Sequence, residues 1–515
     1  MNTQAVLSLL TIFLCLLHLY LANDECVSKD FGYGSTVCVC NKSTCHSVPP
    51  LQKPKKGQYV IYTSNKEGLR LHKGVGNLVA SSTNYKEKNV LKIDEDVLLQ
   101  EMKGFGGAFT DANGINLASL TKDMQEKLIK SYFTEDGIQY SLCRIPIGGT
   151  DFSTHAYSYC DTEEPDKKLT HFKLAEEDHK YKIPYALWAK NLTQDLKFFA
   201  SAWTAPKWMK INGNYSGPMG FLKYEFYQTW AEYHLKFLEA YEREGIDFWG
   251  MTTGNEPVQA LSTSKINSVA WLPWQMLNYV KNNLGPTIKH SKFSKIHLMM
   301  LDDMRFFLPW YTNWVMKDKK ARKYLDGIAV HWYFDDQFSP NLLNKAHNSH
   351  PDKFIINTEA CNGDQTGDIH VMLGSWERGE KYGSSIIEDT NHWVTGWIDW
   401  NMCLDIQGGP TYIDNNVDSP IIVNATANEF YKQPMYYVLG HFSKFIPIGS
   451  HKINSTQIDN KNVPVATFKR PDGGVVTIIL NKKEVNVDLV LINNKKGDVP
   501  LTVSPKSITT VVYYN

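Results

Sequence analysis

Two glutamates stand where acid–base chemistry on a sugar could take place. Glu256 lies between Asn255 and Pro257 after a short apolar run, and Glu359 ends the run Ile355–Glu359. Hydrolysis of a glycosidic bond needs one carboxylic acid to protonate the leaving oxygen and one carboxylate to meet the developing oxocarbenium ion. An Asn-Glu-Pro tripeptide arises by chance in about 6% of chains of this length, so the hypothesis depends on whether the fold brings the two glutamates together.

Eight β-rich runs between about residues 98 and 400 alternate with longer helical patterns. This alternation is typical of parallel strands joined by crossover helices. Eight such units predict an α/β fold of the (β/α)8, or TIM-barrel, type, with a doubly wound sheet as the alternative. The runs are Gly104–Phe109, Tyr140–Ile147, Lys197–Ala202, Phe248–Thr253, Ile296–Leu301, Gly327–Val330, Phe354–Thr358 and Thr395–Trp400.

The segments between the runs show helical periodicity. Residues 226–241 carry aromatic and aliphatic side chains at steps of three and four, a stripe that buries one face of a helix. Weaker patterns of the same kind predict helices over 121–133, 182–192, 310–325 and 372–388.

Reactive groups of a (β/α)8 barrel lie at the rim where strands end and βα loops begin. Asp151 follows the second run, Trp203 follows the third, and Trp400 closes the eighth. Strands four and seven lie roughly across the barrel mouth from each other. We therefore expect Glu256 and Glu359 to face one another over a bound sugar ring.

Three other acidic positions have a structural explanation as an alternative. Asp302 and Asp303, after the fifth run, can be interpreted as a solvated loop pair or a helix cap, and Asp111 after Thr110 as part of a cap.

The flanks of the barrel differ from it in pattern. Alternating apolar residues around the turn Arg470–Gly474, and Val- and Thr-rich runs near the end of the chain, predict β modules in which N-terminal strands pair with the C-terminal segment. We expect a barrel formed by 98–401 with 434–447. Residues 51–97 with 448–515 would form a β-sandwich-like domain, and 23–50 with 402–433 a small disulfide-containing β module.

The start of the chain predicts a secretory route. Residues 1–22 contain an uncharged apolar run typical of a signal peptide, with a single membrane anchor as the alternative. Four cysteines within twenty residues predict two disulfides in an oxidising compartment, with three pairings possible, and a zinc site is the less fitting alternative because paired C-x-x-C spacing is missing. These are Cys26, Cys38, Cys40 and Cys45, and sequons for N-glycosylation occur at Asn41, Asn191, Asn214, Asn424 and Asn454.

Charge composition bears on possible partners. The chain has 54 basic and 54 acidic side chains, which leaves no electrostatic signature of nucleic-acid binding. At a pH near 5, most of the 16 histidines would be protonated at their ordinary pKa of about 6.5, so we expect adsorption to anionic lipid at acidic pH.

Several motifs together resemble the acid β-glucosidases, or glucocerebrosidases, of glycoside hydrolase family 30, over nearly the whole mature chain. The cysteine-rich start from Phe31 to Cys45 takes part in the resemblance. The other motifs are Gly104–Asp111, Arg144–Pro146, Asp151–Ser153, Ser201–Lys210, Asn255–Pro257, His331–Tyr333, Thr358–Cys361, Asp418–Ile422, Tyr431–Met435 and Gly440–Pro447.

The resemblance implies a retaining mechanism and a role for each matching residue. Glu359 matches the nucleophile and Glu256 the acid/base, with Arg144 and Tyr333 beside the nucleophile. Asn255 matches the residue that binds the sugar 2-OH. Tyr333 and four further residues match substrate-binding positions, while core packing is the preferred interpretation for Trp208 and Trp332. The four are Asp151, Trp203, Trp400 and Asn415.

The resemblance also implies partners and a compartment. It implies glucosylceramide as substrate, no metal or organic cofactor, a saposin-type activator, a lysosomal transport receptor and action in the lysosomal lumen, with secretion as the alternative. Residues 258–271 and Asn416 depart from the family, which has aromatic residues there at the cleft entrance. These departures affect the aglycone side.

Other functions stay open at this point. The same chemistry could act on a sterol glucoside, an aryl glucoside or a glucan, and a non-catalytic carbohydrate-binding protein is the alternative from another class. A serine hydrolase and a zinc peptidase are disfavoured because the chain has neither G-x-S-x-G nor H-E-x-x-H.

Overall fold

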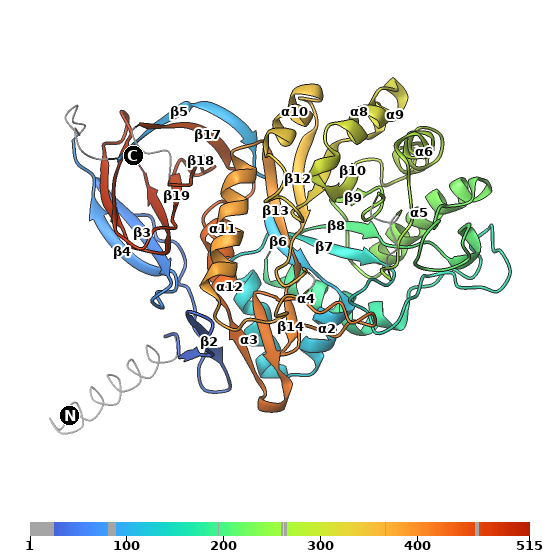
Figure 1. The fold of residues 1–515 in the computed structure, drawn as a ribbon, viewed down its shortest axis with the longest axis horizontal. Coiled ribbons are helices and arrows are strands. Elements are labelled where there is room, and N and C mark those ends of the chain that lie inside the picture. The colour runs from blue at the N-terminus through green and yellow to red at the C-terminus, as the bar shows by residue number, and fades with distance from the viewer. Residues whose placement is uncertain are drawn as a thin grey trace, which may run out of the picture.

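Eight parallel strands close into a barrel at the centre of the molecule, seen in a computed structural model (Figure 1). The structure describes residues 25–80, 89–193, 195–258, 261, 265–365, 367–458 and 463–514. The predicted (β/α)8 fold is confirmed, and the doubly wound alternative is wrong. The barrel strands, in chain order, are β6 (Gly104–Ala108), β7 (Leu142–Ile147), β8 (Lys197–Ala202), β9 (Gly250–Thr252), β10 (His297–Met304), β11 (Gly327–His331), β12 (Phe354–Glu359) and β13 (Val394–Asn401).

Helices cover the outside of the barrel because each presents one apolar face to it. In α5, Trp230, Phe237 and Tyr241 are buried at helical spacing. The helix expected over 310–325 is split in two, because the Asp318 side chain accepts hydrogen bonds from the backbone of Lys320 and Ala321 and so begins a new helix. The α-helices are α2 (Asp111–Ala118), α3 (Lys122–Phe133), α4 (Ile183–Leu192), α5 (Tyr227–Arg243), α6 (Pro273–Tyr279), α7 (Gly285–Lys289), α8 (Trp310–Met316), α9 (Lys319–Tyr324), α10 (Asn341–Ser349), α11 (Trp376–Thr390) and α12 (Pro434–Ser443).

Short 3₁₀ and π segments lie between the strands and helices. They are η1 (Asp178–Lys182), η2 (Lys207–Met209), η3 (Tyr224–Phe226), η5 (Val280–Leu284), η6 (Arg305–Phe307) and η7 (Ala425–Ala427).

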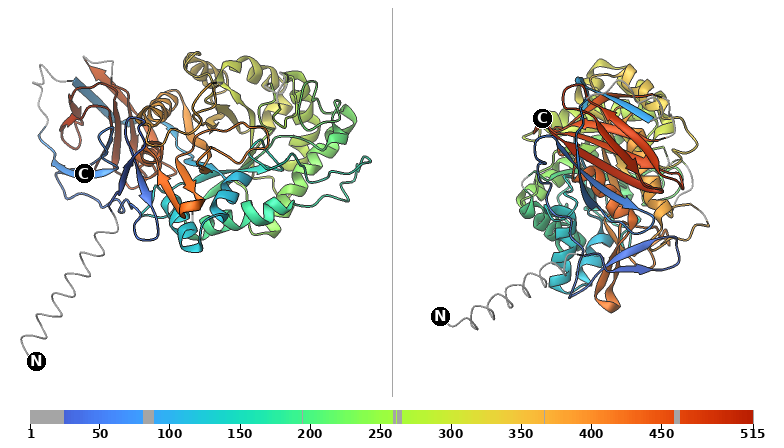
Figure 2. Two further views of the ribbon diagram at one scale, coloured as in Figure 1. Left: turned by 60° about the horizontal axis from the view of Figure 1, so that its bottom comes forward. Right: turned by 90° about the vertical axis from the view of Figure 1, so that its left-hand side faces the viewer.

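A nine-stranded sheet stands beside the barrel and faces the viewer in the right-hand view of Figure 2. The N-terminal and C-terminal parts of the chain meet in this sheet. Strand β3 pairs antiparallel with β22, and Tyr59 lies opposite Tyr513. This confirms the expected pairing of N-terminal strands with the C-terminal segment. The strands are β3 (Gln58–Asn65), β4 (His72–Asn77), β5 (Asn89–Glu101), β17 (His451–Ile458), β18 (Val465–Lys469), β19 (Val475–Asn481), β20 (Val487–Ile492), β21 (Val499–Val503) and β22 (Ser507–Tyr513).

A smaller five-stranded sheet contains the cysteine cluster. Cys26 is bonded to Cys38 and Cys40 to Cys45, so the four sulfurs form disulfides and the zinc alternative is wrong. The strands are β1 (Ser28–Asp30), β2 (Thr36–Cys40), β14 (Cys403–Asp405), β15 (Ile421–Asn424) and β16 (Glu429–Lys432).

Helices α11 and α12 lie between the barrel and the nine-stranded sheet (Figure 1). The buried His441 of α12 joins the two parts, because its ring nitrogens lie 2.8 Å from Thr510 Oγ1 and 2.9 Å from Ser64 Oγ. The expected signal peptide, residues 1–22, lies outside the described residues. Among the helices that the structure does describe, none has the length and apolar character needed to cross a membrane.

Candidate active site

Glu256 lies in the connection after β9, where the backbone is held in an unusual conformation. Its φ of +45° is in the left-handed region, which costs a non-glycine residue about 1–3 kcal/mol. Two backbone hydrogen bonds offset this cost: Glu256 N donates to the carbonyl of Asp302 at 2.8 Å, and Asn255 N donates to that of Ala202 at 2.8 Å. The neighbouring strands β8 and β10 therefore fix the glutamate at the rim.

Glu359 is the last residue of β12, and its carboxylate is held at both oxygens. The hydroxyl of Tyr333 donates to Oε1 at 2.9 Å, and Nη1 of Arg144 donates to Oε2. The side chain is only 7% exposed. Burial raises the pKa of the Glu359 carboxyl, while the neighbouring cations of His331 and Arg144 act in the opposite direction.

His331, at the end of β11, bridges the carboxylates. Its Nδ1 lies 3.0 Å from Oε1 of Glu256, and its Nε2 lies 3.2 Å from Oδ1 of Asp302. Burial lowers the pKa of His331, but the adjacent carboxylates outweigh burial and raise it to about 10. The ring is therefore an imidazolium at neutral pH, and both of its nitrogens donate.

The two glutamates lie close to one another. A Glu256 oxygen, a His331 ring nitrogen and a Glu359 oxygen all lie within 4.8 Å of one another. Carboxyl groups about 5–5.5 Å apart suit a double displacement, whereas about 6.5–9.5 Å leaves room for a water molecule and suits a single displacement. The observed separation favours a double displacement.

Asp302 corrects the sequence prediction. Interpretation of Asp302 and Asp303 as a solvated loop pair or cap is wrong, because β10 continues to Met304 and both side chains are fully buried. A bulge after Leu301 turns the strand, with positive φ at Leu301 and Asp302. The Asp302 carboxylate accepts from five side chains, namely Arg144, Ser201, Thr252, His331 and Thr358. Although burial alone would raise its pKa, Arg144 and these donors hold the pKa of Asp302 well below its usual range.

The other predicted site residues line one pocket of about 240 Å³ around the glutamates. Trp203 and Trp400 stack with ring centroids 5.0 Å apart, and the Arg144 guanidinium lies 4.5 Å from the Trp203 ring centre. Arg144 also donates to the side-chain oxygen of Asn255 at 2.8 Å. The predicted residues in the lining are Asp151, Trp203, Asn255, Glu256, Tyr333, Glu359, Trp400 and Asn415.

Asp151 supplies a group whose charge depends on pH. Asn415 Nδ2 donates to its Oδ2 at 2.7 Å. Burial, together with the negative charge of Glu359, raises the pKa of Asp151 to about 7. At a pH near 5 the carboxyl is therefore protonated, and it can donate a hydrogen bond as well as accept one.

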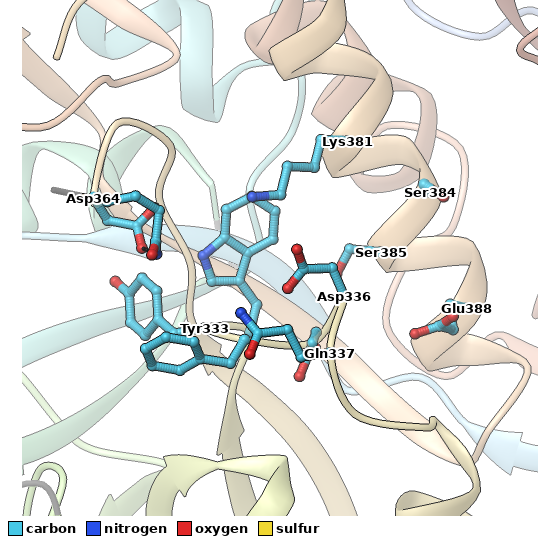
Figure 3. A pocket seen from close by; sticks show the side chains of 12 residues that line it. Tyr333, Asp336, Gln337, Asp364, Lys381, Ser384, Ser385 and Glu388 are labelled. Carbon is cyan, nitrogen blue, oxygen red and sulfur yellow. Dashed lines mark hydrogen bonds between the residues drawn. The ribbon is translucent and has the colours of Figure 1, made fainter. Parts of the chain in front are cut away.

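A second pocket of about 220 Å³ adjoins the first and shares Tyr333, Phe334, Asp364 and Gln365 with it. Figure 3 shows Tyr333 and Asp364 on one side of this pocket and Lys381 of α11 above it. Trp332 lines it but is only 4% exposed and packs against Tyr382 and Trp397, as its core interpretation required. Trp208 is also buried.

The same cluster contains donor types that a metal ion could use. Among the residues that the structure describes, Glu256, His331 and Glu359 form the one group with suitable spacing. The Arg144 guanidinium bonds Glu359, and the protonated His331 bonds Glu256, so the protein's own cations already occupy these carboxylates. The donor set fits proton transfer better than metal binding.

Sequence reasoning did not assign a role to several residues of the site. His331 and Asp302 complete the charge network, and Phe334, Asp364 and Gln365 line the pocket. A usable signal existed for the first two, since both are polar residues at the ends of apolar barrel runs. The last three lie in loops without a comparable pattern.

A (β/α)8 barrel whose mouth holds two opposed carboxylates beside stacked tryptophans defines a glycoside hydrolase. Two family models match the chain: the TIM-barrel domain of glycosyl hydrolase family 30 over residues 102–446, and the beta sandwich domain of that family over 449–511. The chain therefore belongs to glycosyl hydrolase family 30.

Relatives and solved structures agree with this membership. The chain is 40% identical to the lysosomal acid glucosylceramidase of Mus musculus, covering 94% of each chain, and 41% identical to putative glucosylceramidase 3 of Caenorhabditis elegans, covering 98% of each. The crystal structure of SrfJ from Salmonella typhimurium superposes with a TM-score of 0.82 at 23% identity, covering 89% of this chain and all of that one. This last likeness concerns the fold alone.

Proposed function

We propose that this glycoside hydrolase cleaves glucosylceramide to glucose and ceramide by double displacement, through a covalent glucosyl-enzyme intermediate. The observation that carries the mechanism is the approach of the Glu256 and Glu359 oxygens to within 4.8 Å. The substrate is inferred from relatives that are named glucosylceramidases and align over nearly their full length.

In this mechanism Glu359 attacks the anomeric carbon while Glu256 protonates the departing oxygen. Arg144 and Tyr333 bond the two oxygens of Glu359 and orient it for attack. His331 keeps the Glu256 carboxyl in place. After the aglycone leaves, Glu256 removes a proton from water, and that water hydrolyses the glucosyl ester.

Glucose recognition is assigned to the remaining pocket residues. Asn255 is oriented by Arg144 to bond the 2-OH, a contact that strengthens in the transition state. Asp151 and Asn415 form a hydrogen-bonded pair that can bind ring hydroxyls. Trp203 and Trp400 offer indole surfaces to the C–H faces of the sugar.

The cellular setting is part of the proposal. We infer a signal peptide at 1–22, N-glycosylation, transport by a lysosomal receptor, and action in the lysosomal lumen with a saposin-type activator on anionic membranes. Asn191, Asn214 and Asn454 are exposed, whereas Asn41 and Asn424 are half-buried. The Asn424 amide donates to the Tyr431 hydroxyl at 3.0 Å, and a glycan there would replace one of the two hydrogens on that nitrogen.

Histidine protonation contributes less to membrane adsorption than the sequence suggests. Burial lowers the pKa of His46 and His441 to about 3 and that of His234 to about 4. These three stay neutral at a pH near 5. They therefore add no positive charge on acidification.

The mechanism is tested by azide rescue of two alanine variants on an aryl β-glucoside with a good leaving group. In Glu359→Ala, azide replaces the nucleophile and should release α-glucosyl azide. In Glu256→Ala, azide attacks the intermediate and should release β-glucosyl azide. The control is Glu388→Ala in the adjoining pocket, which should keep its activity without azide. The same anomer from both variants would contradict the assignment.

The substrate is tested by competing classes of glucoside. Turnover of glucosylceramide, with and without anionic lipid, is compared with that of sterol glucosides, aryl β-glucosides and a β-glucan. We expect glucosylceramide to show the highest kcat/KM in the presence of anionic lipid. A higher kcat/KM on a glucan would show that the substrate is a polysaccharide and not the lipid. The proposed mechanism would be unaffected.

A further inference from the structure

Three tryptophans stand out on the surface of the barrel. Trp274, Trp310 and Trp314 are 51%, 49% and 39% exposed, and the other tryptophans are buried or half-buried. Trp310, Trp314 and Lys317 follow one another along α8 at steps of four and three, so they share one face of the helix. Trp274 of α6 meets Trp314 with ring centroids 6.4 Å apart. We call these four residues the tryptophan–lysine face.

The tryptophan–lysine face has a basic border. The Lys317 ammonium lies 3.3 Å from the Trp314 ring centre, and Lys319 and Lys320 follow in α9. The nearby carboxylate of Asp318 is already used, since it bonds Lys281 at 2.7 Å and caps α9. In the part of the chain that the structure describes, Lys317, Lys319 and Lys320 form no ion pair with a carboxylate. The border therefore presents unneutralised positive charge.

This composition fits a lipid surface better than a protein partner. Exposed apolar patches mark interaction sites. Lysine is depleted in protein–protein interfaces, whereas tryptophan and lysine together are typical of membrane–water interfaces, where the indole sits at headgroup level and the ammonium reaches phosphate. Anionic lipid attracts each basic residue near its surface.

The tryptophan–lysine face is connected to the catalytic mouth. After β10, which carries Asp302, the chain passes through η6 directly into α8. Phe306 of η6 contacts Phe334, with ring centroids 6.3 Å apart, and Phe334 lines the catalytic pocket. Figure 1 shows α6, α8 and α9 grouped along one edge of the barrel. A membrane docked there would lie beside the pocket entrance.

We propose that Trp274, Trp310, Trp314 and Lys317, with Lys319 and Lys320, form the surface by which this enzyme docks on an anionic lipid bilayer. The inference rests on the proposed membrane-lipid substrate and assigns the docking to one face of the molecule. The tryptophans enter the headgroup region, and the lysines contact the anionic phosphates.

The first experiment measures co-sedimentation with vesicles of phosphatidylcholine and phosphatidylserine. Trp274→Ala/Trp310→Ala/Trp314→Ala should partition at least about tenfold less than the wild type, because three interfacial indoles are lost. Its matched control is Val75→Ala/Leu98→Ala/Val485→Ala, which removes exposed apolar side chains from the nine-stranded sheet region and should bind as the wild type does. Equal partition of both triple variants would overturn the proposal.

A second variant tests the charge without touching the tryptophans. Lys319→Glu/Lys320→Glu should bind anionic vesicles at least about tenfold less, and high salt should abolish the difference. Lys55→Glu/Lys56→Glu, an exposed pair elsewhere on the chain, is the control and should show no such loss. An equal loss of vesicle binding in both double variants would show that only the net charge of the protein matters. That result would overturn the proposal.

Kinetics separate this inference from the proposed function. All variants should hydrolyse a soluble aryl β-glucoside at the wild-type rate, while turnover of glucosylceramide in vesicles falls in parallel with binding. Failure of the wild type on glucosylceramide in detergent would refute the proposed substrate. Normal wild-type turnover with undiminished vesicle binding by the tryptophan variant would refute only the docking surface. Dissociation of a wild-type dimer by the tryptophan substitutions would assign the face to self-association and would overturn the proposal.

Discussion

Two buried arginines at the barrel mouth hold carboxylates in different ways. Arg144 binds Glu359 and Asp302, and His331 adds a second positive charge to the same cluster. Arg305, in η6, faces Asp335, Glu388 and Asp389 as the single cation of its cluster among the described residues. It also donates to the backbone carbonyls of Asp335 and Phe338.

The difference shows that the balance of charge, rather than burial, distinguishes the reactive cluster. Two cations keep the pKa of Asp302 far below its usual range. In the Arg305 cluster, burial and mutual repulsion raise the pKa of Asp335 and Asp389 despite the arginine. The first cluster keeps Asp302 ionised beside the catalytic pocket, and the second fastens the loop that follows β11.

The largest effect should separate the two clusters directly. Glu359→Gln removes the proposed nucleophile and should lower kcat/KM on an aryl β-glucoside by about 10⁴-fold or more. Glu388→Gln removes a carboxylate from the Arg305 cluster and should leave kcat/KM within about threefold, because no reacting atom is nearby. Comparable losses in both variants would abolish the distinction between a reactive and a structural cluster.

The second prediction exchanges the two arginines for methionine. Each change leaves buried acidic groups without their cation. It should cost about 3–5 kcal/mol in the free energy of unfolding. Arg144→Met should also lower kcat by about 100-fold or more, since Glu359 and Asn255 lose their orientation. Arg305→Met should keep near-normal kcat per folded molecule. Denaturant unfolding and active-site titration measure the two quantities separately.

The fold could be predicted from the sequence because barrel strands are buried on both faces and form short, continuous apolar runs. Strands β8 and β12 begin where expected, at Lys197 and Phe354. The sequence pattern ends the fifth strand too early, at Leu301, because the two aspartates that follow resemble a loop. Asp302 can be buried in β10 because Arg144, which is 158 residues away along the chain, binds its carboxylate. Local patterns contain no information on such a partner.

The site residues also divide into those that the local sequence pattern reveals and those that depend on contacts distant along the chain. Residues at strand ends, such as Glu256 and Glu359, could be found from the run pattern alone. The exposed Trp310 and Trp314 could not, because helical spacing indicates that a stripe exists but not which stripe faces the core. Here Tyr311 and Val315 are buried instead. The tryptophans therefore became visible as a surface only in the structure.

The third prediction sharpens the role of the second cation. His331→Gln keeps hydrogen-bonding groups but removes the positive charge that lowers the pKa of Glu359. The pKa of Glu359 should then rise, so the acid limb of the kcat/KM profile moves to higher pH by about one unit, with about a 10- to 100-fold loss at the optimum. His347→Gln on α10 is the control. An unmoved acid limb would show that His331 acts through packing alone.

The smallest effect concerns stability, where Asp302 of the first cluster and Asp335 of the second should respond to pH with opposite sign. The lowered pKa of Asp302 means that its ionised form stabilises the fold above the unfolded pKa of about 3.9, so Asp302→Asn should destabilise at pH 5 and pH 8 alike. The raised pKa of Asp335 means that stability is lost as pH rises above about 4, and Asp335→Asn should relieve this loss. Relative to the wild type, Asp335→Asn should already gain about 1 kcal/mol at pH 5, which is one unit above the unfolded pKa, and should gain more at pH 8. Denaturant unfolding at the two pH values measures both variants, and a gain for Asp302→Asn at pH 8 would reverse the assignment of charge to the two clusters.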